Sequence, residues 1–295
     1  MHDAQMMDRP GISLIVATAG RATELRPLLQ SLVEQHYRDF EILIVDQNSD
    51  ARVDNVLHPF LNFLRIRHIR AETGLSRARN CGLAIANGDW VAFPDDDCWY
   101  KPDTLSEIIR LTKAHPEWNG LIGQYLAPDD TPVFTGSINQ RFAITRDNVW
   151  DYAPSITIFL QRSLACDIGG FNNRLGIGAG PDWAASEETD FLLNALKRNA
   201  LIVYRPEVRV CHPRPFAEIT LGACAKQYRY GLGAGAVMRR HAYPIRALGR
   251  HLLPAMRVVL KLLCRGQFLA ARLHAARVVG MVRGWYQMPH WYAVE

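Results

Sequence analysis

The residues with the clearest chemical potential are three consecutive aspartates, Asp95, Asp96 and Asp97, which follow the apolar residues 90–94. Three adjacent carboxylates repel one another unless cations or hydrogen-bond donors hold them, and the hard cations Mg²⁺ and Mn²⁺ prefer oxygen ligands. The alternative is a solvated acidic turn, which the directly preceding apolar strand makes less favourable. The pattern therefore predicts a divalent cation at Asp95 and Asp97.

A second acidic group, Glu187, Glu188 and Asp190, follows a glycine-rich segment at residues 169–181. Carboxylates in the first turn of a helix complement the helix dipole, which is a purely structural explanation. The functional alternative is a general base, because an ionised glutamate can accept a proton from a hydroxyl group. His212 ends the next predicted strand, and a lone histidine in such a place is more often structural than metal-binding.

Polar residues also follow the first two predicted strands. Thr18 and Arg21 come after the first strand, where Arg21 could meet a phosphate or be an ordinary surface arginine. Asp46 and Asn48 come after the second strand and could accept hydrogen bonds from a nucleobase or a ribose, as acidic residues do in other doubly wound folds. An Asx turn formed by the same two residues explains the pattern equally well.

Residues 74–80 are typical of a helix start with Ser76 as the N-cap. Helix N-termini favour anions, so Arg77 or Arg79 could form charge-assisted hydrogen bonds with a diphosphate, with Asn80 beside them. Surface arginines paired with acidic neighbours would give the same pattern. Both explanations stay open for this segment.

Short β-branched runs alternate with amphipathic helical segments over the first part of the chain. The predicted strands there are residues 12–17, 41–46, 64–70 and 89–94, and the predicted helices are residues 23–35, 76–87 and 101–115. Strands at 121–126, 155–161 and 201–204 and a helix at 187–198 follow less regularly. This order predicts an α/β fold with a mainly parallel sheet flanked by helices, whose ligands lie beyond the carboxyl ends of the strands.

The chain of 295 residues has a net charge of +5 that is unevenly distributed. Residues 219–294 contain 12 Lys or Arg and no Asp or Glu, whereas residues 1–218 contain 22 basic and 28 acidic residues. Such a basic segment indicates an anionic partner. Its cations are interleaved with Leu, Val, Ala and Met rather than with an aromatic platform, which favours a phospholipid surface over nucleic acid.

No run of about 18 uncharged apolar residues is present, and residues 1–10 lack the pattern of a signal peptide. The six cysteines are scattered without a CxxC pair, so neither a disulfide framework nor a zinc ribbon is predicted. We therefore expect a cytoplasmic protein whose basic region, residues 216–295, forms amphipathic helices on the membrane surface. Packing of these helices on the rest of the protein is the alternative.

Residues 11–212 resemble the family-2 glycosyltransferases, which have the GT-A fold. The resemblance rests on segments that occur in the order typical of that family: residues 15–21, 29–35, 44–49, 74–89, 93–97, 169–171 and 186–190, with His212 after them. It implies an inverting transfer of a sugar from a nucleoside diphosphate sugar to an acceptor hydroxyl, on a glycan or a lipid-linked acceptor.

The same resemblance implies a role for each candidate residue. It assigns nucleotide-sugar binding to Thr18, Arg21, Asp46, Asn48, Arg77, Asn80, Asp95 and Asp96, and a Mn²⁺ or Mg²⁺ ion to Asp95, Asp97 and His212. Glu188 stands where relatives commonly carry an aspartate base, so Glu188 is the implied base, with Glu187 and Asp190 as alternatives. Trp183 would stack on a sugar or anchor its loop.

The implied catalytic domain covers residues 1–215, with a nucleotide-sugar half at about 11–115 and an acceptor half at about 116–215. Residues 216–295 form the basic helical region. Two other functions stay open: a catalytically inactive nucleotide-sugar binder or membrane scaffold, and a sugar nucleotidyltransferase. The nucleotidyltransferase is less favoured, because it would need a longer, glycine-rich basic loop than residues 18–21 provide. A dinucleotide-binding dehydrogenase is less favoured still, because no GxGxxG motif follows the first strand.

Overall fold

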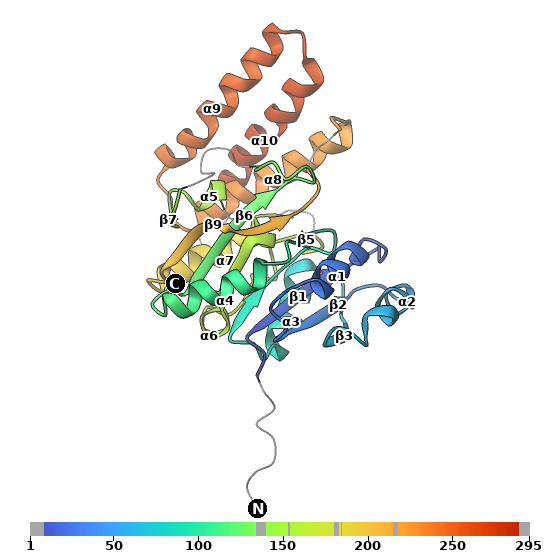
Figure 1. Cartoon of the computed structure of the whole chain (residues 1–295). Coiled ribbons are helices and arrows are strands. Elements are labelled where there is room, and N and C mark those ends of the chain that lie inside the picture. Colours follow the sequence, from blue (N-terminus) through green and yellow to red (C-terminus); the bar gives the residue numbers. More distant parts are fainter. Residues whose placement is uncertain are drawn as a thin grey trace, which may run out of the picture. The chain divides into compact units, whose positions relative to one another are not determined.

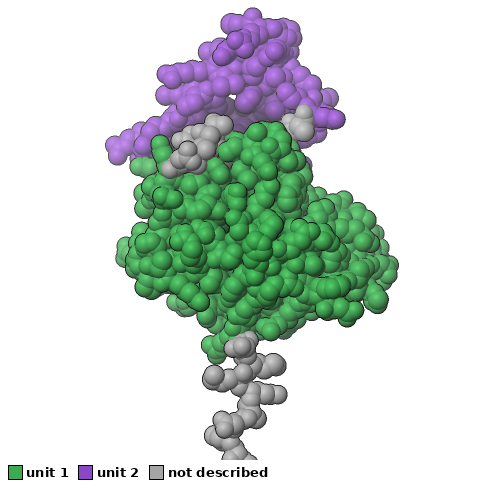
Figure 2. Space-filling view, in the orientation of Figure 1, with its two compact units in different colours: residues 1–73, 77–171, 191–214 green, residues 74–76, 172–190, 215–295 purple. Residues whose placement is uncertain are grey.

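The computed structural model describes residues 9–133, 140–152, 154–179, 183, 185–214 and 218–288. Two compact units make up the chain, and Figure 2 colours them green and purple. Unit 1 consists of residues 1–73, 77–171 and 191–214, and unit 2 of residues 74–76, 172–190 and 215–295. The division expected after residue 215 stays a prediction. Unit 2 contains residues 172–190 in addition to the C-terminal helices.

Unit 1 is built on one mixed sheet (Figure 1). In spatial order the strands are β3 (Ile66–Arg70), β2 (Phe40–Asp46), β1 (Ile12–Thr18), β4 (Trp90–Ala92), β8 (Ile158–Gln161), β6 (Gly120–Leu126), β9 (Ile202–Cys211) and β5 (Trp99–Tyr100), and β7 (Phe142–Ala143) pairs with β9. The strands β1, β2, β3, β4, β6 and β9 run in one direction, and β5, β7 and β8 run in the other. The predicted α/β fold with a mixed, mainly parallel sheet is confirmed.

In this part of the chain, the described residues have helices at the four predicted places, 23–35, 76–87, 101–115 and 187–198, with shifted ends, and three short helices that the sequence pattern does not predict. They are α1 (Leu25–Val33), α2 (Arg52–Leu57), α3 (Leu75–Ile85), α4 (Thr104–Ala114), α5 (Val149–Tyr152), α6 (Arg162–Asp167) and α7 (Glu187–Lys197), with 3-10 turns η1 (His58–Phe60) and η3 (Ser155–Thr157). On α1 the buried residues Leu25, Leu28, Leu29 and Leu32 occupy positions i, i+3, i+4 and i+7, which lie on one face of an amphipathic helix. They join the apolar residues of β1 and β2 in the core of unit 1.

Three local expectations differ from the structure. The strand expected at 201–204 continues to Cys211, because its pairing with β6 resumes after a register shift between Ile122 and Gln124. The strand expected at 155–161 begins only at Ile158, after a 3-10 turn. Ser76 is not an N-cap: the helix already begins at Leu75, and the Ser76 hydroxyl donates to the Leu175 carbonyl at 2.7 Å.

Unit 2 contains the helices α8 (Leu221–Arg240), α9 (Ile245–Cys264) and α10 (Phe268–Gln287), so the predicted C-terminal helical region is confirmed. Helices α8 and α10 touch backbone to backbone. A Cβ atom on Gly231 or Gly235 of α8, or on Gly280 or Gly284 of α10, would overlap a carbonyl oxygen of the opposite helix. Among the residues that the structure describes, no helix combines the length and the apolar content that a membrane crossing needs.

Candidate functional site

The carboxyl ends of β1, β2 and β4 meet at one edge of the unit 1 sheet. The parallel register places Thr18 opposite Asp46, and a parallel bridge joins Ala17 to Asp95. Thr18 and Asp96 are 78 positions apart in the sequence, yet their side chains are hydrogen-bonded. The sheet therefore collects the polar residues that follow three different strands, as expected for an open α/β sheet.

Asp96 anchors the acidic triplet inside unit 1. Its side chain is buried and accepts hydrogen bonds from Thr18 Oγ1 at 2.7 Å and from Arg21 Nε at 3.1 Å. Burial raises the pKa of the Asp96 carboxyl, and the hydrogen bonds from Thr18 and Arg21 oppose that rise. Thr18, Arg21 and Asp96, which the sequence predicts to contact a nucleotide sugar, are therefore hydrogen-bonded to one another.

Asp95 is held from helix α3. Arg79, whose side chain is only 2% exposed, places Nη2 3.1 Å from Asp95 Oδ1, and its guanidinium carbon lies 5.2 Å from the ring centroid of Phe171. Phe171 is fixed in turn by Asn80, whose side-chain amide donates to the Phe171 carbonyl at 2.7 Å and accepts from the Phe171 N–H at 2.8 Å. Asn80 therefore joins two chain segments, while Arg77 on the same helix is exposed.

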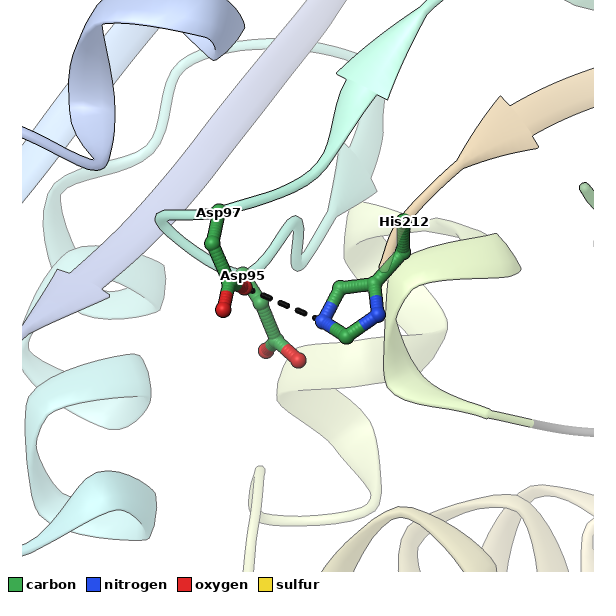
Figure 3. A group of neighbouring side chains, drawn as sticks. All are labelled: Asp95, Asp97 and His212. Atoms are coloured by element: carbon green, nitrogen blue, oxygen red, sulfur yellow. Dashed lines mark ion pairs between the residues drawn. The ribbon is translucent and has the colours of Figure 1, made fainter. Parts of the chain in front are cut away.

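Asp95, Asp97 and His212 form the candidate metal site, and Figure 3 shows their side chains converging. One potential ligand atom from each residue lies within 4.8 Å of the other two. His212 Nε2 is 3.0 Å from Asp97 Oδ1, and the other ring nitrogen, Nδ1, is 2.6 Å from the Pro213 carbonyl. The Tyr125 hydroxyl lies 3.2 Å from the same Nδ1. Such contacts on the far side of the ring orient metal-binding histidines.

The charges of this site favour a cation. Burial disfavours ionisation of Asp97, but His212 and Arg21 outweigh this effect and lower the pKa of Asp97 to about 2. Burial lowers the pKa of His212, whereas the neighbouring Asp97 and Asp95 raise it overall. Asp97 Oδ1 is buried, and His212 Nε2 lies 3.0 Å from it. An ionised Asp97 fits a divalent cation, which would take the place of the proton that His212 carries when it pairs with Asp97.

Asp46 is fully buried at the end of β2, and protein groups contact both of its carboxylate oxygens. Oδ1 accepts hydrogen bonds from the backbone N–H and the side-chain amide of Asn48, each at 2.8 Å, so an Asx turn is present. Oδ2 lies 3.0 Å from His68 Nε2 and 2.8 Å from Arg70 Nη1. Asn48 Oδ1 also accepts from the Gly20 N–H at 2.7 Å, which ties this loop to the one after β1.

The three acidic residues of the α7 start differ in exposure. Glu187 is 5% exposed and Asp190 is fully buried, whereas Glu188 is partly exposed. Asp190 Oδ1 lies 3.0 Å from Arg240 Nε and 2.7 Å from His241 Nε2, and both partners stand at the end of α8. Glu188 is therefore the most accessible of the three base candidates.

Trp183 is partly buried in unit 2. Its carbonyl accepts a hydrogen bond from the Gly176 N–H at 2.9 Å, which closes the loop before α7. Residues 180–182 and 184 lie outside the described residues. The loop-anchoring contact is made by the backbone of Trp183, so a sugar-stacking role of its indole stays a prediction.

Comparison with known proteins identifies the family to which the chain belongs. The model of Glycosyl transferase family 2 matches residues 13–164. A PGL/p-HBAD biosynthesis glycosyltransferase of Mycobacterium bovis is 27% identical over 226 residues, which is 75% of this chain and 84% of that protein. An uncharacterized glycosyltransferase of Haemophilus influenzae is 26% identical over 204 residues, and the match covers 66% of this chain and 65% of that relative's length.

Two solved structures show the same fold. The mannosyltransferase PcManGT from Pyrobaculum calidifontis, in complex with GDP-Man and Mn²⁺, has a TM-score of 0.66 at 18% identity, over 95% of this chain and 89% of that chain. Residues 1–349 of TarS from S. aureus, in complex with UDP-GlcNAc, have a TM-score of 0.62 at 18% identity, over 90% of both chains. The likeness confirms the GT-A fold for this protein.

Proposed function

The chain belongs to glycosyl transferase family 2, and from this premise we propose that it is an inverting glycosyltransferase that uses a nucleoside diphosphate sugar. The observation that carries the proposal is the grouping of Asp95, Asp97 and His212 at the carboxyl edge of the sheet. Two carboxylates and an imidazole are suitable ligands for Mn²⁺ or Mg²⁺. When bound there, such a cation supplies charge stabilisation for a diphosphate leaving group.

Residues of the chain account for the rest of the proposed reaction. Glu188 accepts the proton of the acceptor hydroxyl, and the acceptor oxygen forms a bond to the anomeric carbon. The bond between that carbon and the diphosphate oxygen breaks at the same time, so the nucleoside diphosphate leaves and the anomeric configuration inverts. Asn48, Arg70 and His68 form the proposed contact surface for the nucleoside, and the buried Asp46 fixes their positions.

For the donor we propose a hexose linked to UDP or GDP, because proteins of this fold bind UDP-GlcNAc and GDP-Man. With Mn²⁺ and donor at about 100 times the dissociation constant, binding adds about 2.7 kcal/mol to the free energy of unfolding. For a chain of this size the melting temperature should rise by roughly 5–10 °C. A thermal-shift panel of UDP- and GDP-sugars, each with Mn²⁺ or with chelator, measures this effect.

Assays of the released products separate the remaining functions. Release of nucleoside diphosphate in the presence of an acceptor supports a transferase, and donor binding without any release supports an inactive binder. Release of pyrophosphate from a nucleoside triphosphate and a sugar phosphate would support a nucleotidyltransferase instead. A protein that no sugar nucleotide stabilises, with or without cation, would contradict the proposed function.

We also propose that helix α9 lies on the cytoplasmic face of a membrane and that the acceptor is a glycan or a lipid-linked hydroxyl compound at that surface. Leu253, Met256, Leu260 and Leu263 are 43–61% exposed and recur every three or four residues, so they share one face of α9. Arg250, Arg257, Lys261 and Arg265 are also exposed and lie on a neighbouring face. This combination of an apolar stripe and cations is typical of interfacial helices.

Binding to anionic vesicles tests this part of the proposal. The protein should sediment with phosphatidylserine vesicles at low salt and be released at high salt, because each nearby cation contributes about 1 kcal/mol of screened attraction. The double variant Arg257→Gln/Lys261→Gln should lower the partition coefficient about tenfold or more. Removal of two exposed cations from unit 1, Arg26→Gln/Lys113→Gln, is the matched control and should leave binding unchanged. Equal losses of vesicle binding in both double variants, or no vesicle binding by the wild type at low salt, would contradict the proposal that α9 lies on a membrane.

A further inference from the structure

We infer that Asp190 is a positioning residue, which fastens the first turn of α7, and Glu188 within it, to the last turn of α8 through Arg240 and His241. The inference rests on the proposed role of Glu188 as the base. If Asp190 has this role, unit 2 takes part in catalysis, because the end of α8 determines the position of the Glu188 carboxylate. Asp190, Arg240, His241 and Glu188 all belong to unit 2.

The burial of this cluster excludes Asp190 from direct contact with an acceptor and gives it a different task. The Asp190 side chain is 0% exposed and that of His241 is 0% exposed, while Arg240 is 18% exposed. Asp190 Oδ1 accepts from Arg240 Nε at 3.0 Å and lies 2.7 Å from His241 Nε2. A buried carboxylate is tolerated only when donors surround it, so the three side chains fix one another's positions.

Helix geometry explains why this anchor acts on Glu188. Glu187 and Asp190 are three positions apart and share one face of α7, and both are buried. Glu188 lies two positions before Asp190 and therefore points to another side of the helix, where it is partly exposed. Because Asp190 is held in the interior, the first turn of α7 has little freedom to rotate. Glu188 therefore stays on the partly exposed side of the helix.

The segment before α7 is fixed to α8 at a second place. Ser186 has a φ of 67°, in the left-handed region that is unfavourable for a residue with a side chain, and its carbonyl accepts from the Asp190 N–H at 3.0 Å. The Ala185 carbonyl packs so closely on Gly233 of α8 that a Cβ at Gly233 would overlap it. Strained backbone persists where surrounding contacts determine it, and here Asp190 and Gly233 supply those contacts.

A double-mutant cycle tests the inference on the full-length protein with the donor that the panel identifies. Asp190→Ala should lower kcat about tenfold to hundredfold with an unchanged KM for the donor, because a displaced catalytic group loses its alignment. Asp190→Asn keeps an oxygen that can accept from both partners and should restore most of kcat. In the Glu188→Gln background, Asp190→Ala should change kcat by less than about threefold, because the group that it positions is already gone.

The outcomes separate this inference from the proposed function. Equal fold-losses from Asp190→Ala in both backgrounds, or no loss in either, would overturn the positioning role. A Glu188→Gln protein with full activity would instead overturn the assignment of the base. If Asp190→Ala does not fold, His241→Gln provides the same cycle, since glutamine retains one donor toward Asp190 but shifts it. Its loss of kcat must also disappear in the Glu188→Gln background.

Discussion

Replacement of Asp97 by alanine is expected to lower kcat by about 10²- to 10³-fold, because a metal ion that stabilises a leaving group contributes several kcal/mol to the transition state. Asp97 is a ligand candidate that is held in its ionised form, since His212 and Arg21 lower its pKa to about 2. The variant should also lose the stabilisation by Mn²⁺ in a thermal melt. Excess chelator should reduce the wild-type rate to a similar level.

The metal-free fold should survive this substitution. A fall in the pKa of Asp97 from about 4 to about 2 corresponds to roughly 2 kcal/mol of stability at neutral pH, present above the unfolded-state pKa and lost as the pH falls through about 2. That loss is below the 5–15 kcal/mol that domains usually have. Asp167→Ala removes an exposed carboxylate at the end of α6 and is the matched control. It should change neither kcat nor the free energy of unfolding. A folded Asp97→Ala protein that turns over at the wild-type rate in chelator would contradict the metal site.

The position of the acidic triplet could be predicted from the sequence, but the separate tasks of its three members could not. A β-branched or apolar run followed by polar residues indicates a buried strand and its carboxyl end, and this local signal located Thr18, Asp46 and Asp95. A run of three aspartates does not show which of the three side chains is buried in the folded protein. Asp96 is buried because Thr18 and Arg21, more than 70 positions away, lie beside it in the folded sheet.

The sequence does not show the contacts of residues whose partners come from distant segments. The sequence suggests a phosphate contact for Arg79, whereas the structure shows its guanidinium buried between Asp95 and the ring of Phe171. His68 has no local signal, because its role depends on the pairing of β3 with β2. In the sequence, Arg240 is one of the 12 cations of residues 219–294 and His241 carries no signal of its own, yet both lie against Asp190 in the structure. Composition identifies a basic helix, but tertiary packing decides which of its cations are buried beside a carboxylate.

Replacement of Glu188 by glutamine is expected to lower kcat by about 10²- to 10⁴-fold, the usual contribution of a general base. Glutamine has nearly the same shape as glutamate but cannot accept the acceptor's proton at neutral pH. Because Glu188 is partly exposed, the substitution leaves no uncompensated group in the core, and donor binding measured by thermal shift should be retained. A loss of kcat with unchanged donor binding distinguishes the base from a residue that only contacts the donor.

Two neighbouring substitutions make this test specific. Glu187→Gln introduces the same chemical change one position earlier, at a side chain that is 5% exposed, and should leave kcat far less affected. Glu188→Asp keeps the acid but withdraws it by one methylene, so its kcat should fall between those of the wild type and Glu188→Gln, because a displaced base is misaligned rather than absent. If Glu187→Gln is the inactive variant and Glu188→Gln is active, the base is Glu187. If both glutamine variants are fully active, the two carboxylates serve only the dipole of α7.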